Sequence, residues 1–134
     1  MDLQKLDDAL LGVFEKRVEL SQMTYDNKNY DDVEEELHDL EDDFNDMYGD
    51  FLEKALMEVH REYCSESDVL LPTAYIPKKY IIKEDGSVEA EKKEGVVVEL
   101  DEDPAANARL MLLPSPTKIV LMAGKNSRTV WKAV

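Results

Sequence analysis

Residues 30–63 read YDDVEEELHDLEDDFNDMYGDFLEKALMEVHREY, and this stretch decides the fold. Its apolar residues recur in alternating steps of three and four: Tyr30, Val33, Leu37, Leu40, Phe44, Met47 and Phe51. That spacing places all of them on one stripe of an α-helix. The sequence therefore predicts a single long helix that begins near Tyr30 and ends near Tyr63.

The other faces of the predicted helix are acidic. From Asp31 to Glu53 there are twelve carboxylates and neither Lys nor Arg. We expect an exposed acidic face made by Asp32, Glu35, Glu36, Asp39, Asp42, Asp43, Asp46 and Asp50. Five pairs of these residues lie four apart, and each like-charge pair destabilises an isolated helix by about 0.2–0.5 kcal/mol.

The apolar stripe changes phase near Gly49. After Phe51 the apolar positions become Leu52, Leu56, Val59 and Tyr63. A phase change beside a glycine indicates a bend or a change of packing partner. We expect the first part of the helix to face an N-terminal helix, and its last turns to face the C-terminal half of the chain.

The N-terminal residues 2–23 form a second amphipathic pattern. Leucines and valines recur there at helical spacing, and Asp2 is placed to cap the helix. The connection Thr24–Asn29 is short and polar, with Asp26 or Asn29 as candidate caps of the next helix. Because a short connection joins antiparallel neighbours, residues 1–64 should form an acidic helical hairpin.

The C-terminal half, residues 72–134, has the period of β-strands. Six candidate strands lie between turn signals, at residues 79–84, 87–93, 96–100, 109–113, 118–123 and 129–134. Asp85-Gly86 is a pair favoured in a two-residue hairpin turn. The expected fold is α+β: one domain over residues 1–134, with the antiparallel helical hairpin packed on an antiparallel β-meander of five or six strands.

Charge is divided unevenly along the 134 residues, which carry a net charge of −15. Residues 1–68 hold 22 acidic and 6 basic side chains, whereas residues 69–134 hold 9 and 10. Nucleic acid and anionic lipid should be repelled by the acidic half, while basic proteins and divalent cations should be attracted. We therefore expect neither a nucleic-acid nor a membrane partner.

The cellular location is predicted from the single cysteine and the absence of targeting signals. One cysteine, Cys64, excludes an internal disulfide and favours a reducing compartment. No apolar run approaches the roughly 20 residues that cross a bilayer, and the N-terminus lacks the basic start of a signal peptide. A cytoplasmic protein is expected.

Metal-ligand patterns are incomplete. Glu35 and His38 have the spacing used by di-metal carboxylate bundles, but Met57 stands where a second copy beside His60 needs an acid. Residues 26–32 fail as a calcium loop, because Lys28 occupies a ligand position. The acidic loop at residues 101–103 fits a solvated turn better than an ion site. No metal or cofactor is expected.

A nucleophilic site is equally incomplete. Cys64 follows His60 by four residues, so a helix would place both on one face. No third orienting residue and no glycine-rich oxyanion or phosphate loop accompanies them. A buried cysteine at the helix end is the favoured interpretation, and no catalytic residue is assigned.

The basic residues of the C-terminal half raise the question of a nucleic-acid-binding sheet. Tyr80 and Trp131 are candidate stacking residues. Nine of the ten basic residues of this half are candidate cations for such a surface: Lys78, Lys79, Lys83, Lys92, Lys93, Lys118, Lys125, Arg128 and Lys132. This half carries a net charge of only +1, from 10 basic and 9 acidic residues. Lysines that keep sheet edges soluble are the better interpretation.

The acidic face leaves three function classes open. The first is a non-enzymatic binding or regulatory protein, of the chaperone, immunity or inhibitor type, whose acidic helix docks a basic protein. The second is a self-associating subunit, such as a homodimer formed through the apolar stripe or a free sheet edge. The third is a divalent-metal protein or enzyme that uses the acidic helix. Acids that serve only solubility remain the competing interpretation.

Overall fold

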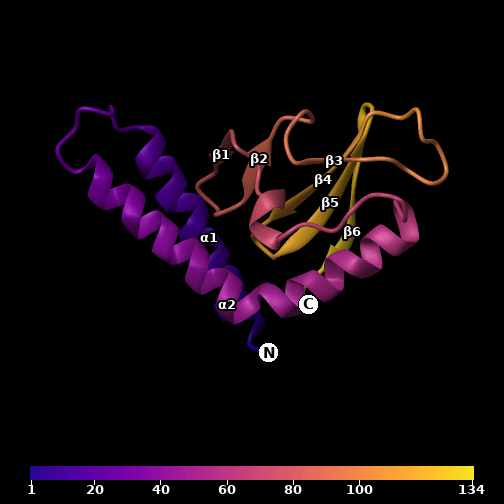
Figure 1. Cartoon of the computed structure of the whole chain (residues 1–134), viewed down its shortest axis with the longest axis horizontal. Coiled ribbons are helices and arrows are strands. Elements are labelled where there is room, and N and C mark those ends of the chain that lie inside the picture. Colours follow the sequence, from indigo (N-terminus) through magenta and orange to yellow (C-terminus); the bar gives the residue numbers. More distant parts are fainter.

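The computed structural model describes all 134 residues and confirms the α+β class. Two packed helices are followed by a short 3₁₀ helix and six antiparallel strands (Figure 1). The elements are α1 (Leu3–Ser21), α2 (Tyr30–Tyr63), η1 (Pro72–Tyr75), β1 (Tyr80–Ile82), β2 (Val88–Ala90), β3 (Val96–Val98), β4 (Ala108–Leu113), β5 (Lys118–Ala123) and β6 (Asn126–Lys132).

The caps of the two helices differ from one another. Asp2 caps α1 as predicted, because its side chain accepts a hydrogen bond from the Lys5 backbone N–H at 3.1 Å. Asn29 is the N-cap residue of α2, but its side chain makes no capping bond. The Asn27 carbonyl accepts from the Tyr30 N–H at 3.0 Å instead. Asn29 therefore occupies the predicted N-cap position without a side-chain bond, and Asp26 does not cap α2.

Helix α2 is continuous but turns near its middle (Figure 1). We call residues 30–47 the N-terminal arm and residues 48–63 the C-terminal arm. The N-terminal arm runs beside α1, whereas the C-terminal arm lies along the four-stranded sheet, and Phe51 packs on Trp131 of β6 with ring centroids 5.9 Å apart. The predicted change of packing partner is confirmed. A Cβ at Gly49 would meet no atom within 4 Å, so close packing does not require that glycine.

The predicted apolar stripe is wrong at two of its positions, Leu40 and Met47. Met47 is 68% exposed and Leu40 is 36% exposed, while Tyr48 is buried. The buried positions follow the true helical period of 3.6 residues, whereas the predicted stripe followed a 3.5-residue repeat. A straight helix drifts by about 20° per seven residues against such a repeat. Between Val33 and Tyr48 this drift accumulates, so that Tyr48 rather than Met47 faces the core.

The six strands divide into two sheets. Strands β3, β4, β5 and β6 form a meander in that order, and β1 pairs only with β2. The chain between β2 and β3 passes tightly over β4 at Gly95, where the backbone has φ +92°. A Cβ there would lie 2.4 Å from the Leu110 carbonyl oxygen. This close approach of the backbone to β4 requires glycine.

Two turns differ in detail from the prediction. The β1–β2 loop has three residues rather than two, because the Lys83 N–H bonds to the Ser87 carbonyl and Gly86 takes φ +85°. Strand β6 begins at Asn126 rather than Thr129, since Gly124 and Lys125 alone make the turn. Gly124 has φ +60°, which suits the first central position of a type II′ turn.

The two central strands of the four-stranded sheet, β4 and β5, are buried on both sides. Leu112, Ile119 and Trp131 share the face that meets α2, because they are paired in register across β4, β5 and β6. Met111 and Val120 lie on the opposite face and line a hollow with Val88 and Ala90 of β2. The order of layers is therefore α2, four-stranded sheet, β1–β2 hairpin.

The helical hairpin covers less of the sheet than the sequence suggested. Only the C-terminal arm of α2 lies along the four-stranded sheet, and the rest of the hairpin extends beyond it (Figure 1). Helix α1 is held to β1, where the Tyr80 hydroxyl donates to the Phe14 carbonyl at 2.7 Å. Asp7 of α1 accepts from the Ser115 N–H and the Thr117 hydroxyl, both at 2.9 Å, in the β4–β5 turn.

Candidate functional site

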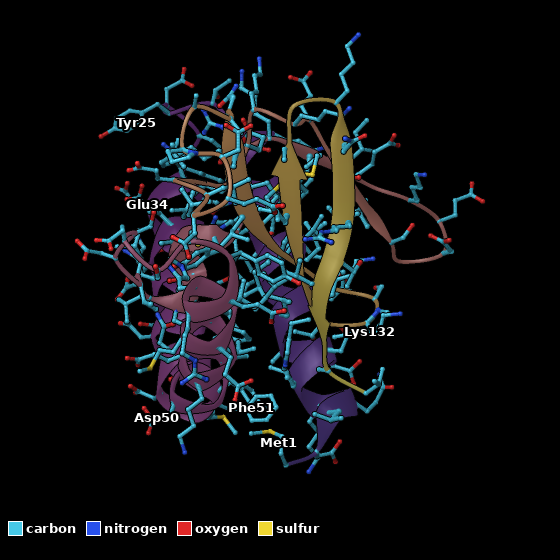
Figure 2. All side chains as sticks on the ribbon, turned by 90° about the vertical axis from the view of Figure 1, so that its right-hand side faces the viewer. Met1, Tyr25, Glu34, Asp50, Phe51 and Lys132 are labelled. Atoms are coloured by element: carbon cyan, nitrogen blue, oxygen red, sulfur yellow. The ribbon has the colours of Figure 1, made fainter.

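The candidate site is the acidic face of α2, and the structure places all of its predicted members in solvent. Val33, Leu37 and Phe44 are buried on the side of α2 that packs within the chain. Figure 2 shows Glu34 and Asp50 on the outer side of the helix, whereas Phe51 points inward. The exposed carboxylates are Asp32, Glu35, Glu36, Asp39, Asp42, Asp43, Asp46 and Asp50.

Only one member of the acidic face is neutralised within the chain. Glu36 pairs with Lys16 of α1 at 2.9 Å, and the hydrogen bonds that Lys16 donates, first to Glu36 and then to Glu19, raise the pKa of Lys16. Arg17 is engaged by Glu41, which is not a member of the face, at 3.2 Å. The other seven carboxylates form no ion pair. The face therefore carries an uncompensated negative charge.

The acidic face is convex rather than hollow. The largest of the five best-formed surface hollows has a volume of about 490 Å³ and lies on the β1–β2 hairpin. None of the five is lined by a member of the face. Small-molecule sites are concave and bury most of their ligand. A convex charged helix instead suits contact with a macromolecule.

The incomplete metal-ligand patterns of the sequence are not completed by residues from other elements. No three His, Cys, Asp or Glu side chains converge on one point. Glu35 and His38 are both exposed on α2, and no further ligand comes from another element. Asn27, in the segment compared with a calcium loop, uses its side-chain oxygen to accept from the Asn29 N–H at 2.9 Å.

His60 and Cys64 are both buried, and each has a structural role. His60 Nδ1 lies 3.0 Å from the Ser67 carbonyl, and Nε2 lies 2.8 Å from the Tyr75 hydroxyl. A neutral ring donates to the carbonyl and accepts from the tyrosine, which in turn accepts from the Leu70 N–H at 3.0 Å. Neither ring nitrogen is available to deprotonate the thiol.

The thiol of Cys64 is kept protonated by its surroundings. Burial, followed by the charge of Asp101, raises its pKa to about 11. A nucleophilic cysteine needs the opposite shift, toward the thiolate. The prediction of a buried cysteine at the helix end is confirmed by its position as C-cap of α2 and its complete burial.

Two carboxylates outside the acidic face have roles that the sequence did not indicate. Asp101 accepts from the Ser65 N–H and hydroxyl at 3.0 and 2.9 Å, so it fastens the acidic loop to the end of α2. Asp7 joins α1 to the β4–β5 turn, as described above. Both contacts link residues far apart in sequence, and no local pattern predicts them. Residues 101–103 are exposed, as predicted for a solvated turn, and Asp101 in addition anchors this turn to the end of α2.

The two aromatic residues considered for base stacking are already engaged. Trp131 packs on Phe51, and Tyr80 packs edge-on against Phe14 with ring centroids 4.7 Å apart. Arg128 lies over the Tyr63 ring, 5.0 Å from its centroid. These contacts join the sheet to the helices and leave no free aromatic platform beside these cations.

The comparisons with known proteins add no relative. The chain matches no protein-family model, no curated protein and no solved structure. None of its helices is both long and apolar enough to cross a membrane.

Proposed function

We propose that this chain is a small non-enzymatic binding protein, and that the acidic face of α2 docks a basic protein. The observation that carries the proposal is the set of seven exposed carboxylates that have no cationic partner within the chain. The inner side of this helix already packs against the core of the chain. The outer side is left with one strong property, its negative charge.

The energetics of the face favour a partner. Five like-charge pairs four residues apart cost the free helix about 1–2.5 kcal/mol in total. Typical domains are stable by only about 5–15 kcal/mol. A cationic partner would convert this repulsion into attraction and would also accelerate association through the long-range field.

The competing explanation is that the acids only keep the protein soluble. Solubility depends on total charge and not on where the charge lies. Docking depends on the face itself. A variant that removes charge from the face must therefore differ from one that removes the same charge elsewhere.

The test compares two variants that each lose four negative charges. The face variant changes Asp39, Asp42, Asp43 and Asp46 to Asn. The control variant changes the exposed residues Glu15, Glu58, Glu66 and Glu102 to Gln. Each immobilised protein is mixed with lysate of its source cells at about 0.1 M salt, and bound proteins are eluted toward about 0.5 M, where exposed charges are strongly screened.

Docking predicts that the wild type and the control variant retain the same basic protein, which salt releases, while the face variant does not. Equal retention by all three proteins would overturn the proposal. So would equal loss from both variants, because that would assign the binding to net charge alone.

A homodimer formed through the apolar stripe is the less supported proposal. Val33, Leu37 and Phe44 are buried inside the chain and offer little surface to a second copy. Light scattering at micromolar concentration separates the two proposals, since docking of a basic protein requires no dimer. We also propose a cytoplasmic location, which rests on the single unpaired cysteine.

A further inference from the structure

One exposed flank of α2, beside the buried stripe, carries a second regular stripe. Its members follow steps of four, three, four and three residues, and they alternate acid with apolar: Glu36, Leu40, Asp43, Met47 and Asp50. Residues at this spacing share one face of a helix. We call this stripe the outer seam.

The two apolar members of the outer seam are incompletely covered by the chain. Met47 is 68% exposed and Leu40 is 36% exposed, although both lie on a helix rich in buried leucine and phenylalanine. Isolated exposed apolar residues are common on protein surfaces. Here two of them lie in register, each with acidic neighbours three or four residues away on both sides.

We propose that the outer seam binds a basic amphipathic helix of the partner, with apolar side chains of that helix seated on Leu40 and Met47. This inference rests on the proposed function and specifies the shape and the sequence pattern of the partner. Lysine or arginine residues of the partner helix would face Asp43 and Asp50, since Glu36 is already paired with Lys16. Methionine suits such a contact because its unbranched side chain adapts to different partners.

The spacing of the apolar pair favours a helix over an extended peptide. Leu40 and Met47 are seven residues apart, which is about 10.5 Å along a helix at 1.5 Å per residue. A partner helix presents residues seven apart at the same spacing, as in a coiled coil. An extended strand presents same-face residues about 6.6 or 13 Å apart, so it matches one position and misses the other.

Charge excludes a second copy of this chain as the occupant. Pairing two outer seams would bring Glu36, Asp43 and Asp50 of one copy against the same acids of the other. Like charges placed across an interface oppose association. The complementary occupant is a helix that carries positive charge between its apolar residues.

The test selects binders from a displayed library of random 20-residue peptides, using the intact protein at about 0.1 M salt. Three variants are examined in parallel. The seam variant is Leu40→Ser with Met47→Ser. The matched control is Met57→Ser, which changes a methionine that is 53% exposed on the C-terminal arm. The face variant has the four Asp→Asn changes described above. Circular dichroism checks that each variant folds.

The inference expects selected peptides to be basic, to place apolar residues seven apart with helical spacing between them, and to become helical when bound. The seam variant should weaken their binding at least tenfold, whereas Met57→Ser should leave it unchanged. Replacing a central residue of a selected peptide with proline should also abolish binding, because proline breaks a helix.

Two results would contradict different claims. Basic peptides without helical spacing, bound equally well by the wild type and the seam variant but lost from the face variant, would overturn the inference and leave the proposed function standing. Failure to enrich basic peptides over neutral ones would overturn both.

Discussion

The two arms of α2 belong to one helix but are stabilised in different ways. The C-terminal arm buries Tyr48, Gly49, Leu52, Ala55, Leu56, Val59 and His60 against the sheet and η1. The N-terminal arm buries only Val33, Leu37 and Phe44, on a narrow stripe that faces α1. The C-terminal arm therefore supplies packing against the core, and the N-terminal arm supplies an exposed charged surface.

The largest expected effect is a difference between two leucine-to-alanine changes. Leu56 on the C-terminal arm is fully buried, whereas Leu37 on the N-terminal arm is 7% exposed. Water can therefore enter part of the cavity that truncation of Leu37 leaves. We expect Leu56→Ala to lower the unfolding free energy by about 3–5 kcal/mol and Leu37→Ala by about 2 kcal/mol. Urea unfolding followed by circular dichroism measures both. Equal losses would contradict the contrast between the arms.

The next effect concerns the end of the C-terminal arm at high pH. Burial raises the pKa of Cys64 from 9.0 to about 11, so the unfolded thiol ionises first as the pH rises. The fold should therefore lose up to about 3 kcal/mol of stability from this group between pH 9 and pH 11, while none is lost below pH 9. Thermal unfolding at several pH values measures it.

Cys64→Ala is the control for that measurement. It removes the thiol but keeps a small side chain, so its stability should fall less steeply over the same pH range. Tyr80 also has a raised pKa, of about 12, and its loss of stability above pH 10 should persist in this variant. Identical pH profiles for the wild type and Cys64→Ala would refute the assignment to Cys64.

A smaller effect of opposite sign is expected on the N-terminal arm. The face variant, Asp39, Asp42, Asp43 and Asp46 to Asn, removes four of the five like-charge pairs. It should gain about 0.8–2 kcal/mol of stability, because each pair costs about 0.2–0.5 kcal/mol. The difference in stability between this variant and the wild type should shrink in about 0.5 M NaCl, because the salt screens the repulsion between the carboxylates of the wild type. A loss of stability would show that these carboxylates make contacts that hold the free protein together.

The smallest expected effect on stability comes from the ion pair between Arg17 of α1 and Glu41 of the N-terminal arm. Their ion pair spans 3.2 Å and is partly exposed, with side chains about a quarter accessible. A double-mutant cycle with Arg17→Met and Glu41→Gln should give a coupling of about 0.2–1 kcal/mol. Coupling well above that range would make this ion pair, and not apolar packing, the main tie between the helices.

The local patterns of the sequence predicted much of the fold. Helix α2 has the predicted ends, Tyr30 and Tyr63, because a long run of helical spacing is a strong signal. The β1–β2 hairpin and the C-terminal meander follow from alternation between turn residues. The exposure of the acidic face follows from the apolar stripe on its other side. The docking role of that face stays a prediction.

Other features required the tertiary structure. Met47, which was expected on the apolar stripe, is exposed and Tyr48 beside it is buried, because a small error in the assumed helical period accumulates along the helix. His60 was considered with Cys64, four residues away, but its ring bonds to Tyr75 and Ser67. The tertiary fold, and not the spacing in the sequence, determines these hydrogen-bond partners.

The sequence by itself determined the secondary structure and the acidity of one helix, because period and charge are properties of adjacent residues. Only the tertiary structure decided which charges remain unpaired and which apolar residues remain outside. Lys16 of α1 reaches Glu36 but no other member of the acidic face. The bend of α2 sends one arm to the sheet and leaves the other beside α1. Leu40 and Met47 of the outer seam stay exposed, although Leu37 and Phe44 beside them are buried.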